Sequence, residues 1–309
     1  MSHPGVEVIS AYLAEFSLFG GTIPEQRAAL DQMSSGSGPP EGITVESVSL
    51  GGRGGEWLIP TGGASDAAVL YLHGGGYCIG SLDTHRQLAG RIAVATGCRV
   101  ATLDYRLAPE HPFPAAVDDA SAAYRDLLSS GLLPDRIAIA GDSAGGGLTV
   151  SALLALRAAG TPLPAAVACL SPWADLTQSS AAYSRNADRD PMVSKSGLDL
   201  MARSYLGDAD ARSELASPLY ASDLGGLPPV RIEVGECEVL IDDAIVLAER
   251  LEKAGASVSL IVWPHLLHVF QAFPGSVIPE SDQSISGIGS FLAEHLGLAQ
   301  AAADPHQPS

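Results

Sequence analysis

Short apolar runs alternate with stretches of helical pattern through most of this 309-residue chain. Six of the runs lack the strict alternation of a half-buried strand: AAVLYLHG (67–74), RVATLDY (99–105), RIAIAGD (136–142), AAVACLS (165–171), VRIEVGE (230–236) and SVSLIVW (257–263). Segments with apolar residues at helical spacing lie between most of them: HRQLAGRIAVATG, PAAVDDASAAYRDLLSS, GGGLTVSALLALRAAG and DDAIVLAERLEKAG. Strands of this kind, joined by helices, predict a mostly parallel sheet with helices on both faces.

Two further strands precede these six. ITVESVSL (43–50) alternates as a strand does, and EWLIP (56–60) returns as its hairpin partner after a turn at GGRGG (51–55). The sequence therefore predicts an eight-stranded α/β sheet in which two antiparallel strands come before six parallel ones.

The remaining segments predict a helical cap. Residues 1–31 have a helical apolar pattern and are followed by the linker SSGSGPPEG, while 176–220 contain no strand and are long enough to form a lid. The predicted organisation is N-terminal cap helices over 1–40, a first core part over 41–175, a cap or lid insertion over 176–220, a second core part over 221–298 and a disordered tail over 299–309.

Charge and cysteine content exclude several classes of function. Seventeen Lys and Arg against 35 Asp and Glu give a formal charge of −18, which repels nucleic acids and anionic membrane surfaces. The first Lys or Arg is Arg27, no apolar run is long enough to span a bilayer, and the four cysteines form no CxxC pair. We therefore expect a soluble cytoplasmic protein with reduced thiols, no metal site and no other cofactor.

A single serine stands among glycines in GDSAGGG (141–147), directly after an apolar run. A Gly-x-Ser-x-Gly pattern between a strand and a helix is typical of a nucleophile held in a sharp turn, where side chains two residues away from the serine would not fit. The NH groups that begin the following helix favour negative charge beside Ser143. A glycine-rich loop with an incidental serine is the alternative, and the flanking strand and helix disfavour it.

A second glycine loop, HGGG, follows the third strand of the predicted sheet. A phosphate-binding loop would need Gly-Lys-Ser/Thr, which is absent here. Glycine NH groups that point into a pocket can instead hold an oxyanion. We predict the NH groups of Gly74, Gly75 and Ala144 as the donors, with Gly76 shaping the turn and His73 orienting the loop.

Two histidines, His265 and His268, follow the last strand in PHLLHVF. Ligands of a parallel sheet bind beyond the carboxyl ends of its strands, so this loop reaches the same edge as Ser143. His268 lies farther along the loop and is the better candidate for the general base, with His265 as the alternative. Five other histidines are predicted to lie away from the site: His3, His85, His111, His295 and His306.

Four carboxylates follow the seventh strand in GECEVLIDD. Glu238 stands at the turn just past the strand, where it can meet the Nδ1–H of His268. Asp242 and Asp243 fit the first turn of the next helix, where acids are favoured by the helix dipole, and Glu236 can point to solvent. Glu238 is therefore the predicted acid, and Asp242 is the alternative.

Together these motifs resemble the hormone-sensitive-lipase-like branch of the α/β-hydrolases, the bacterial carboxylesterases. The resemblance covers nearly the whole chain and is carried by HGGGY (73–77), DYRLAPEHPFPAA (104–116), GDSAGG (141–146), SPW (171–173) and HVF (268–270). It implies the α/β-hydrolase fold with a helical cap, Ser143 as the nucleophile, and the first two glycines after His73 as oxyanion donors. It also makes a homodimer through the last strand plausible.

One motif departs from the pattern of this family. The usual acid motif is Asp-Pro-Leu-x-Asp, whereas this chain has Glu-Val-Leu-Ile-Asp at 238–242, which puts Glu238 at the aspartate position. The predicted reaction is the hydrolysis of small-molecule, short-chain carboxylic esters through an acyl group on Ser143, with His268 moving the proton. Two alternatives stay open: a lactone hydrolase or deacetylase, and a non-catalytic binder like the plant hormone receptors of this family, which lack the histidine that this chain retains.

Overall fold

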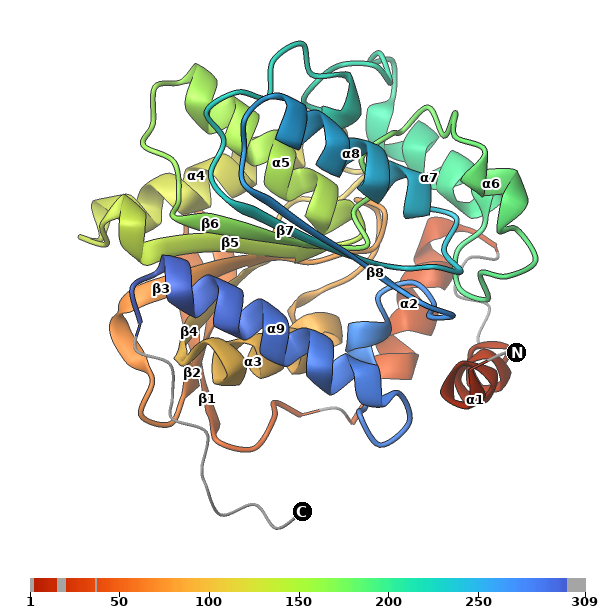
Figure 1. Ribbon diagram of the computed structural model, residues 1–309, viewed down its shortest axis with the longest axis horizontal. Coiled ribbons are helices and arrows are strands. Elements are labelled where there is room, and N and C mark those ends of the chain that lie inside the picture. The colour runs from red at the N-terminus through yellow and green to blue at the C-terminus, as the bar shows by residue number, and fades with distance from the viewer. Residues whose placement is uncertain (1–2, 16–20, 37, 299–309) are drawn as a thin grey trace.

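An eight-stranded sheet runs through the computed structural model, which describes residues 3–15, 21–36 and 38–298 (Figure 1). The strand order is β1-β2-β4-β3-β5-β6-β7-β8. The strands are β1 (Ile43–Leu50), β2 (Arg53–Pro60), β3 (Ala64–Leu72), β4 (Cys98–Leu103), β5 (Ile137–Asp142), β6 (Ala166–Leu170), β7 (Val230–Gly235) and β8 (Val258–Trp263). The pairs β1–β2 and β2–β4 are antiparallel and the other neighbours are parallel, which confirms the predicted sheet.

Helices cover both faces of the sheet (Figure 1). Those on one face are α4 (Ala115–Ser129), α5 (Ala144–Ala158) and α8 (Ile241–Lys253), and those on the other are α3 (Leu82–Thr96) and α9 (Pro279–His295). The side chains of β3 alternate between two buried cores: Leu70 and Leu72 belong to the core under α4 and α5, and Val69 and Tyr71 to the core under α3 and α9. Because both faces are covered, the parallel strands are apolar on both sides, and they therefore appear as continuous apolar runs in the sequence.

The turn between β1 and β2 is shorter than predicted. Only Gly51 and Gly52 form it, and Arg53 already pairs with Leu50 across the hairpin. Both turn glycines have positive φ angles, +57° and +80°, which is the conformation that a two-residue hairpin loop requires. The prediction of a five-residue turn at 51–55 was therefore wrong.

The segments predicted as a cap lie beside the carboxyl ends of the parallel strands (Figure 1). They contain α1 (Pro4–Leu13), α2 (Ile23–Ser34), α6 (Ala182–Arg185) and α7 (Lys195–Leu206). Ile9 and Leu13 of α1 pack against Leu266, Leu267 and Phe270 in the loop after β8. The division into cap and core stays a prediction, and the predicted tail at 299–309 lies outside the described residues.

The four cysteines are buried with free thiols. Burial raises the pKa of Cys78, Cys98 and Cys169 to about 12, so these thiols stay protonated and pack as small apolar groups. None of the described helices is both long and apolar enough to cross a bilayer. The cytoplasmic location and the pairing of two copies through the edge strand β8 stay predictions.

Candidate active site

Ser143 lies in a sharp turn between β5 and α5. Its backbone has φ +53° and ψ −120°, a strained conformation for a residue with a side chain. A Cβ on Gly141 would collide with the carbonyl oxygen of Gly145, and a Cβ on Gly145 would collide with that of Leu72. Glycine is therefore required two residues before and two residues after Ser143, for the steric reason that the sequence pattern indicates.

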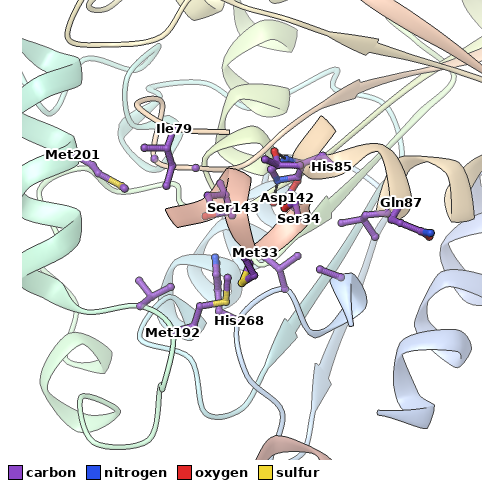
Figure 2. Close-up of a pocket in the computed structure, with 18 of the residues that line it drawn as sticks. Met33, Ser34, Ile79, His85, Gln87, Asp142, Ser143, Met192, Met201 and His268 are labelled. Carbon is purple, nitrogen blue, oxygen red and sulfur yellow. Dashed lines mark hydrogen bonds and ion pairs between the residues drawn. The ribbon is translucent and has the colours of Figure 1, made fainter. Parts of the chain in front are cut away.

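His268 and Ser143 line the same pocket, and Figure 2 shows the imidazole directed toward Ser143. The imidazole is buried, and its Nδ1 donates a hydrogen bond of 2.8 Å to Glu238 Oε2. Because Nδ1 carries the proton, the neutral ring presents the lone pair of Nε2. Within the described ranges no hydrogen bond joins the Ser143 hydroxyl to the imidazole, and catalytic bonds of this kind often tighten only when substrate is bound.

Glu238 is fully buried and each of its carboxylate oxygens is engaged. Oε1 accepts hydrogen bonds from the Gly235 NH at 2.5 Å and from the Ser171 hydroxyl at 2.7 Å, while Oε2 faces His268. The Ser171 hydroxyl also accepts the NH of Val269 at 3.2 Å, which ties the histidine loop to the acid. Sequence reasoning assigned no role to Ser171, although it is the first residue of the SPW motif.

The insertion between β6 and β7 forms hydrogen bonds with the turn that contains Glu238. The side-chain amide of Asn186 donates to the carbonyl oxygen of Glu238 at 2.7 Å, and Asp190 accepts the NH of Val239 at 3.0 Å. Burial raises the pKa of Asp190 to about 6. Residues 182–193 therefore fix the position of Glu238 from outside the sheet.

The alternative residues from the sequence lie elsewhere. Asp242 faces Arg185 at 2.7 Å, and Asp243 accepts backbone NH groups after β6 from its position in the first turn of α8. The side chain of His265 is about half exposed and faces Glu236 at 3.5 Å. None of these three candidates lines the pocket that contains Ser143.

The pKa of His268 lies above its ordinary value of 6.5. Burial alone would lower the pKa, because a charged imidazole is poorly solvated there, but the adjacent Glu238 carboxylate outweighs this effect. Asp190 and Asp142 add smaller contributions in the same direction. The surroundings of this imidazole therefore favour its positive form, which a general base passes through during the reaction.

The glycine loop differs from the prediction in one residue. The NH of Gly74 donates a hydrogen bond of 3.0 Å to Asp142 Oδ1, so the prediction that it serves an oxyanion was wrong. Gly75 and Gly76, with φ angles of +107° and +58°, line the pocket, and in residues 38–298 no hydrogen bond engages their NH groups. Ala144 is the first residue of α5, where helix NH groups lack an intrahelical partner. The candidate donors are therefore Gly75, Gly76 and Ala144.

His73 contacts the glycine loop and holds it in place. Its Nδ1 donates to the carbonyl oxygen of Gly74 at 2.7 Å, and its ring stacks on Tyr105 with the centroids 4.3 Å apart. Burial lowers the pKa of His73 to about 3, so this imidazole is neutral at ordinary pH. These contacts agree with a role in orienting the loop.

His85 was predicted to lie away from the site, and this prediction was wrong. The residue lies in the first turns of α3 and lines the pocket together with Ser143 and His268 (Figure 2). Its Nε2 is 3.5 Å from Asp142 Oδ2. The capping box formed by Ser81 and Thr84 starts the helix a few residues after the glycine loop, and in its first turn His85 lies beside Asp142, the last residue of β5.

The pocket is a mostly apolar cavity of about 110 Å³. Three of the four methionines in the chain line it: Met33 from α2, Met192 from the insertion and Met201 from α7 (Figure 2). Methionine side chains are flexible and adapt to ligands of different shape. Sequence reasoning missed this grouping, because the three residues come from segments that are far apart in the chain.

Comparison with known proteins gives consistent matches over the whole fold. A family model described as an alpha/beta hydrolase fold matches residues 69–272. An acetyl-hydrolase of Streptomyces hygroscopicus is 42% identical over 302 residues, which are 96% of this chain and 99% of that protein. The carboxylesterase NlhH of Mycobacterium tuberculosis is 38% identical over 226 residues, 70% of each chain. The crystal structure of an esterase from the bacterial hormone-sensitive lipase family is 45% identical, with a TM-score of 0.92, over 96% of this chain and 100% of that chain.

Proposed function

This chain belongs to the α/β-hydrolase family, in its bacterial hormone-sensitive-lipase branch, and we infer that it is a serine carboxylesterase for esters of short acyl groups. The observation that carries this function is the buried hydrogen bond of 2.8 Å between His268 and Glu238, in the pocket that Ser143 lines. A hydroxyl, an imidazole and a carboxylate in this order support acyl transfer to serine.

In the first half of the reaction the Ser143 hydroxyl attacks the ester carbonyl carbon while His268 Nε2 takes its proton. The carbonyl oxygen becomes an oxyanion, for which the NH groups of Gly75, Gly76 and Ala144 are the proposed donors. The tetrahedral intermediate then collapses, the bond to the alcohol oxygen breaks, and His268 gives its proton to that oxygen. Glu238 keeps Nδ1 protonated throughout and stabilises the positive imidazole.

In the second half a water molecule takes the place of the alcohol. His268 removes a proton from the water as the water oxygen attacks the acyl carbon, and the same NH groups donate hydrogen bonds to the second oxyanion. Collapse returns the proton to Ser143 and releases the carboxylic acid. No step in this sequence needs a group beyond the residues named and water.

The size of the cavity supports a short acyl group. An apolar cavity of roughly 150 Å³ holds one benzene ring, so about 110 Å³ accommodates about four or five non-hydrogen atoms. The name of the Streptomyces relative, an acetyl-hydrolase, supports the same range. We expect kcat/KM for p-nitrophenyl esters to be highest with acyl chains of about two to six carbons and about 100-fold lower with decanoate.

The purified protein tests the proposed function directly in this assay. Rapid turnover of the acetate or butyrate ester is the expected result, and the absence of turnover with every ester, lactone and amide in a panel would contradict an enzyme. Met201→Ala enlarges the cavity beside Gly76, so this variant should move the optimum toward longer chains. An optimum at decanoate in the unaltered protein would overturn the short-chain assignment.

Activity should depend on pH through His268. The general base must be neutral to accept the serine proton, and the pKa of His268 lies above 6.5. The value of kcat/KM should therefore rise with pH along a limb whose midpoint is above 6.5 and then level off. A pH profile with p-nitrophenyl butyrate measures this midpoint, and a limb centred well below 6.5 would contradict the electrostatic influence of Glu238.

A further inference from the structure

A second pair of imidazole and carboxylate lies in the pocket, formed by His85 and Asp142. His85 Nε2 is 3.5 Å from Asp142 Oδ2, and the two side chains are 14% and 4% exposed. Figure 2 shows both side chains beside Ser143, on the side of the pocket opposite Met201. The mechanism above uses neither residue.

Asp142 fixes the start of the glycine loop. Its Oδ1 accepts hydrogen bonds from the Tyr71 hydroxyl at 2.6 Å and from the Gly74 NH at 3.0 Å. The backbone of Gly74 is pressed so closely against this carboxylate that a Cβ there would collide with Oδ2. Because Gly75 and Gly76 follow directly, the direction of their NH groups depends on how Asp142 is held.

The charge of Asp142 creates an electrostatic problem at the site. This buried carboxylate lies one residue before Ser143, where it would repel an oxyanion that forms on the substrate. Tyr71 and Gly74 donate hydrogen bonds but bring no charge, and burial lowers the pKa of His73 to about 3, so that ring is neutral too. No lysine or arginine of the described segments forms an ion pair with Asp142, which leaves the His85 imidazole as its partner on the pocket side, with Nε2 3.5 Å from Oδ2.

The acidity of Asp142 agrees with this pairing. Burial would raise the pKa of the carboxyl, but His85 and the Tyr71 hydroxyl outweigh that effect and the pKa lies below its ordinary value. Asp142 is therefore ionised, although its side chain is almost completely buried. An ionised buried carboxylate needs a partner, and His85 supplies one from the pocket side.

We propose that His85 is a positioning residue for ester hydrolysis: it holds and balances the Asp142 carboxylate, which in turn aims the NH groups of Gly75 and Gly76 at the oxyanion. This inference rests on the proposed function of the same site. It adds a second imidazole to the machinery, one that acts through the glycine loop and takes no proton from the serine.

Two substitutions of His85 test the role. His85→Leu removes the imidazole that pairs with Asp142, and should lower kcat for p-nitrophenyl butyrate by about 10- to 100-fold while KM changes by less than about threefold. His85→Gln restores a hydrogen-bond donor toward Asp142 and should recover part of the loss. The affinity for a trifluoromethyl ketone, which forms an oxyanion on the serine, should fall by the same factor as kcat/KM.

A double substitution separates positioning from general damage. If His85 acts by balancing the charge of Asp142, then His85→Leu should cost less than about threefold when it is introduced into an Asp142→Asn background. Arg86→Gln is the matched control, because Arg86 is the next residue of α3 and pairs with Glu56 outside the pocket. This variant loses a partly buried ion pair between α3 and β2 and should keep kcat within about threefold.

These outcomes distinguish a failure of the positioning role of His85 from a failure of the proposed esterase function. If the unaltered protein hydrolysed no ester, the proposed function itself would be contradicted. An active protein in which His85→Leu and His85→Gln both keep kcat and ketone affinity within about twofold would overturn the role of His85 alone. An equal loss from His85→Leu with and without the Asp142 carboxylate would also overturn it, because the two residues would then act independently.

Discussion

Ser143→Ala should abolish ester hydrolysis, lowering kcat by about 10⁶-fold, without a measurable loss of folding stability. The hydroxyl is the proposed attacking group, so its removal leaves no atom to carry the acyl chain. Alanine keeps the Cβ and the backbone of the turn, and no hydrogen bond of the Ser143 hydroxyl is present in the described segments. The melting temperature should therefore stay within about 2 °C of the unaltered protein.

Steady-state kinetics with p-nitrophenyl butyrate and a thermal melt measure both quantities. Ser151→Ala is the matched control, because Ser151 is also a buried serine on α5 but lies outside the pocket. This control should keep its full activity. Activity of Ser143→Ala within tenfold of the unaltered protein would show that another group attacks the ester.

Glu238→Gln should lower kcat by about 10⁴-fold. The carboxylate accepts hydrogen bonds from Ser171, Gly235 and His268, and an amide of the same shape cannot accept all of them. If its NH₂ group faces His268, the imidazole must carry its proton on Nε2 and can no longer accept the serine proton. The remaining activity should have an acid limb at lower pH, because the charge that raises the pKa of His268 is gone.

Asp242→Asn is the comparison for this variant. Asp242 belongs to the same run of carboxylates but faces Arg185 and the NH of Ala182, so its amide should change kcat by less than about threefold. Loss of kcat in the opposite order, or equal losses, would move the catalytic acid away from Glu238.

The sheet could be predicted because its signal is local. A strand that is covered on both faces must be apolar throughout, and the runs at β3 and β5 show this directly in the sequence. The candidate acid could also be predicted from the sequence, because Glu238 follows the end of β7 by a few residues while Asp242 already lies in the first turn of a helix. The hairpin turn was misjudged because glycine is common both in turns and in strands that approach one another closely.

The parts of the site that could not be predicted depend on direction in space. The rotation of one peptide group decides whether the NH of Gly74 points to the pocket or to Asp142. A run of glycines in the sequence does not indicate that rotation. His85 is an ordinary polar residue in the first turns of a helix, and it becomes part of the site because Ser81 starts that helix where it does. Ser171 likewise contacts Glu238 across 67 residues of chain.

The central claim is that Ser143 takes up the acyl group while the NH groups of Gly75, Gly76 and Ala144 hold its oxygen. A crystal structure of the protein after reaction with a p-nitrophenyl phosphonate tests it most directly, because phosphorus stays on the attacking atom in tetrahedral geometry. The account predicts phosphorus bonded to Ser143 Oγ and the phosphoryl oxygen about 2.7–3.1 Å from those three nitrogen atoms. Phosphorus on any other residue, or a phosphoryl oxygen directed away from the glycine loop, would contradict it.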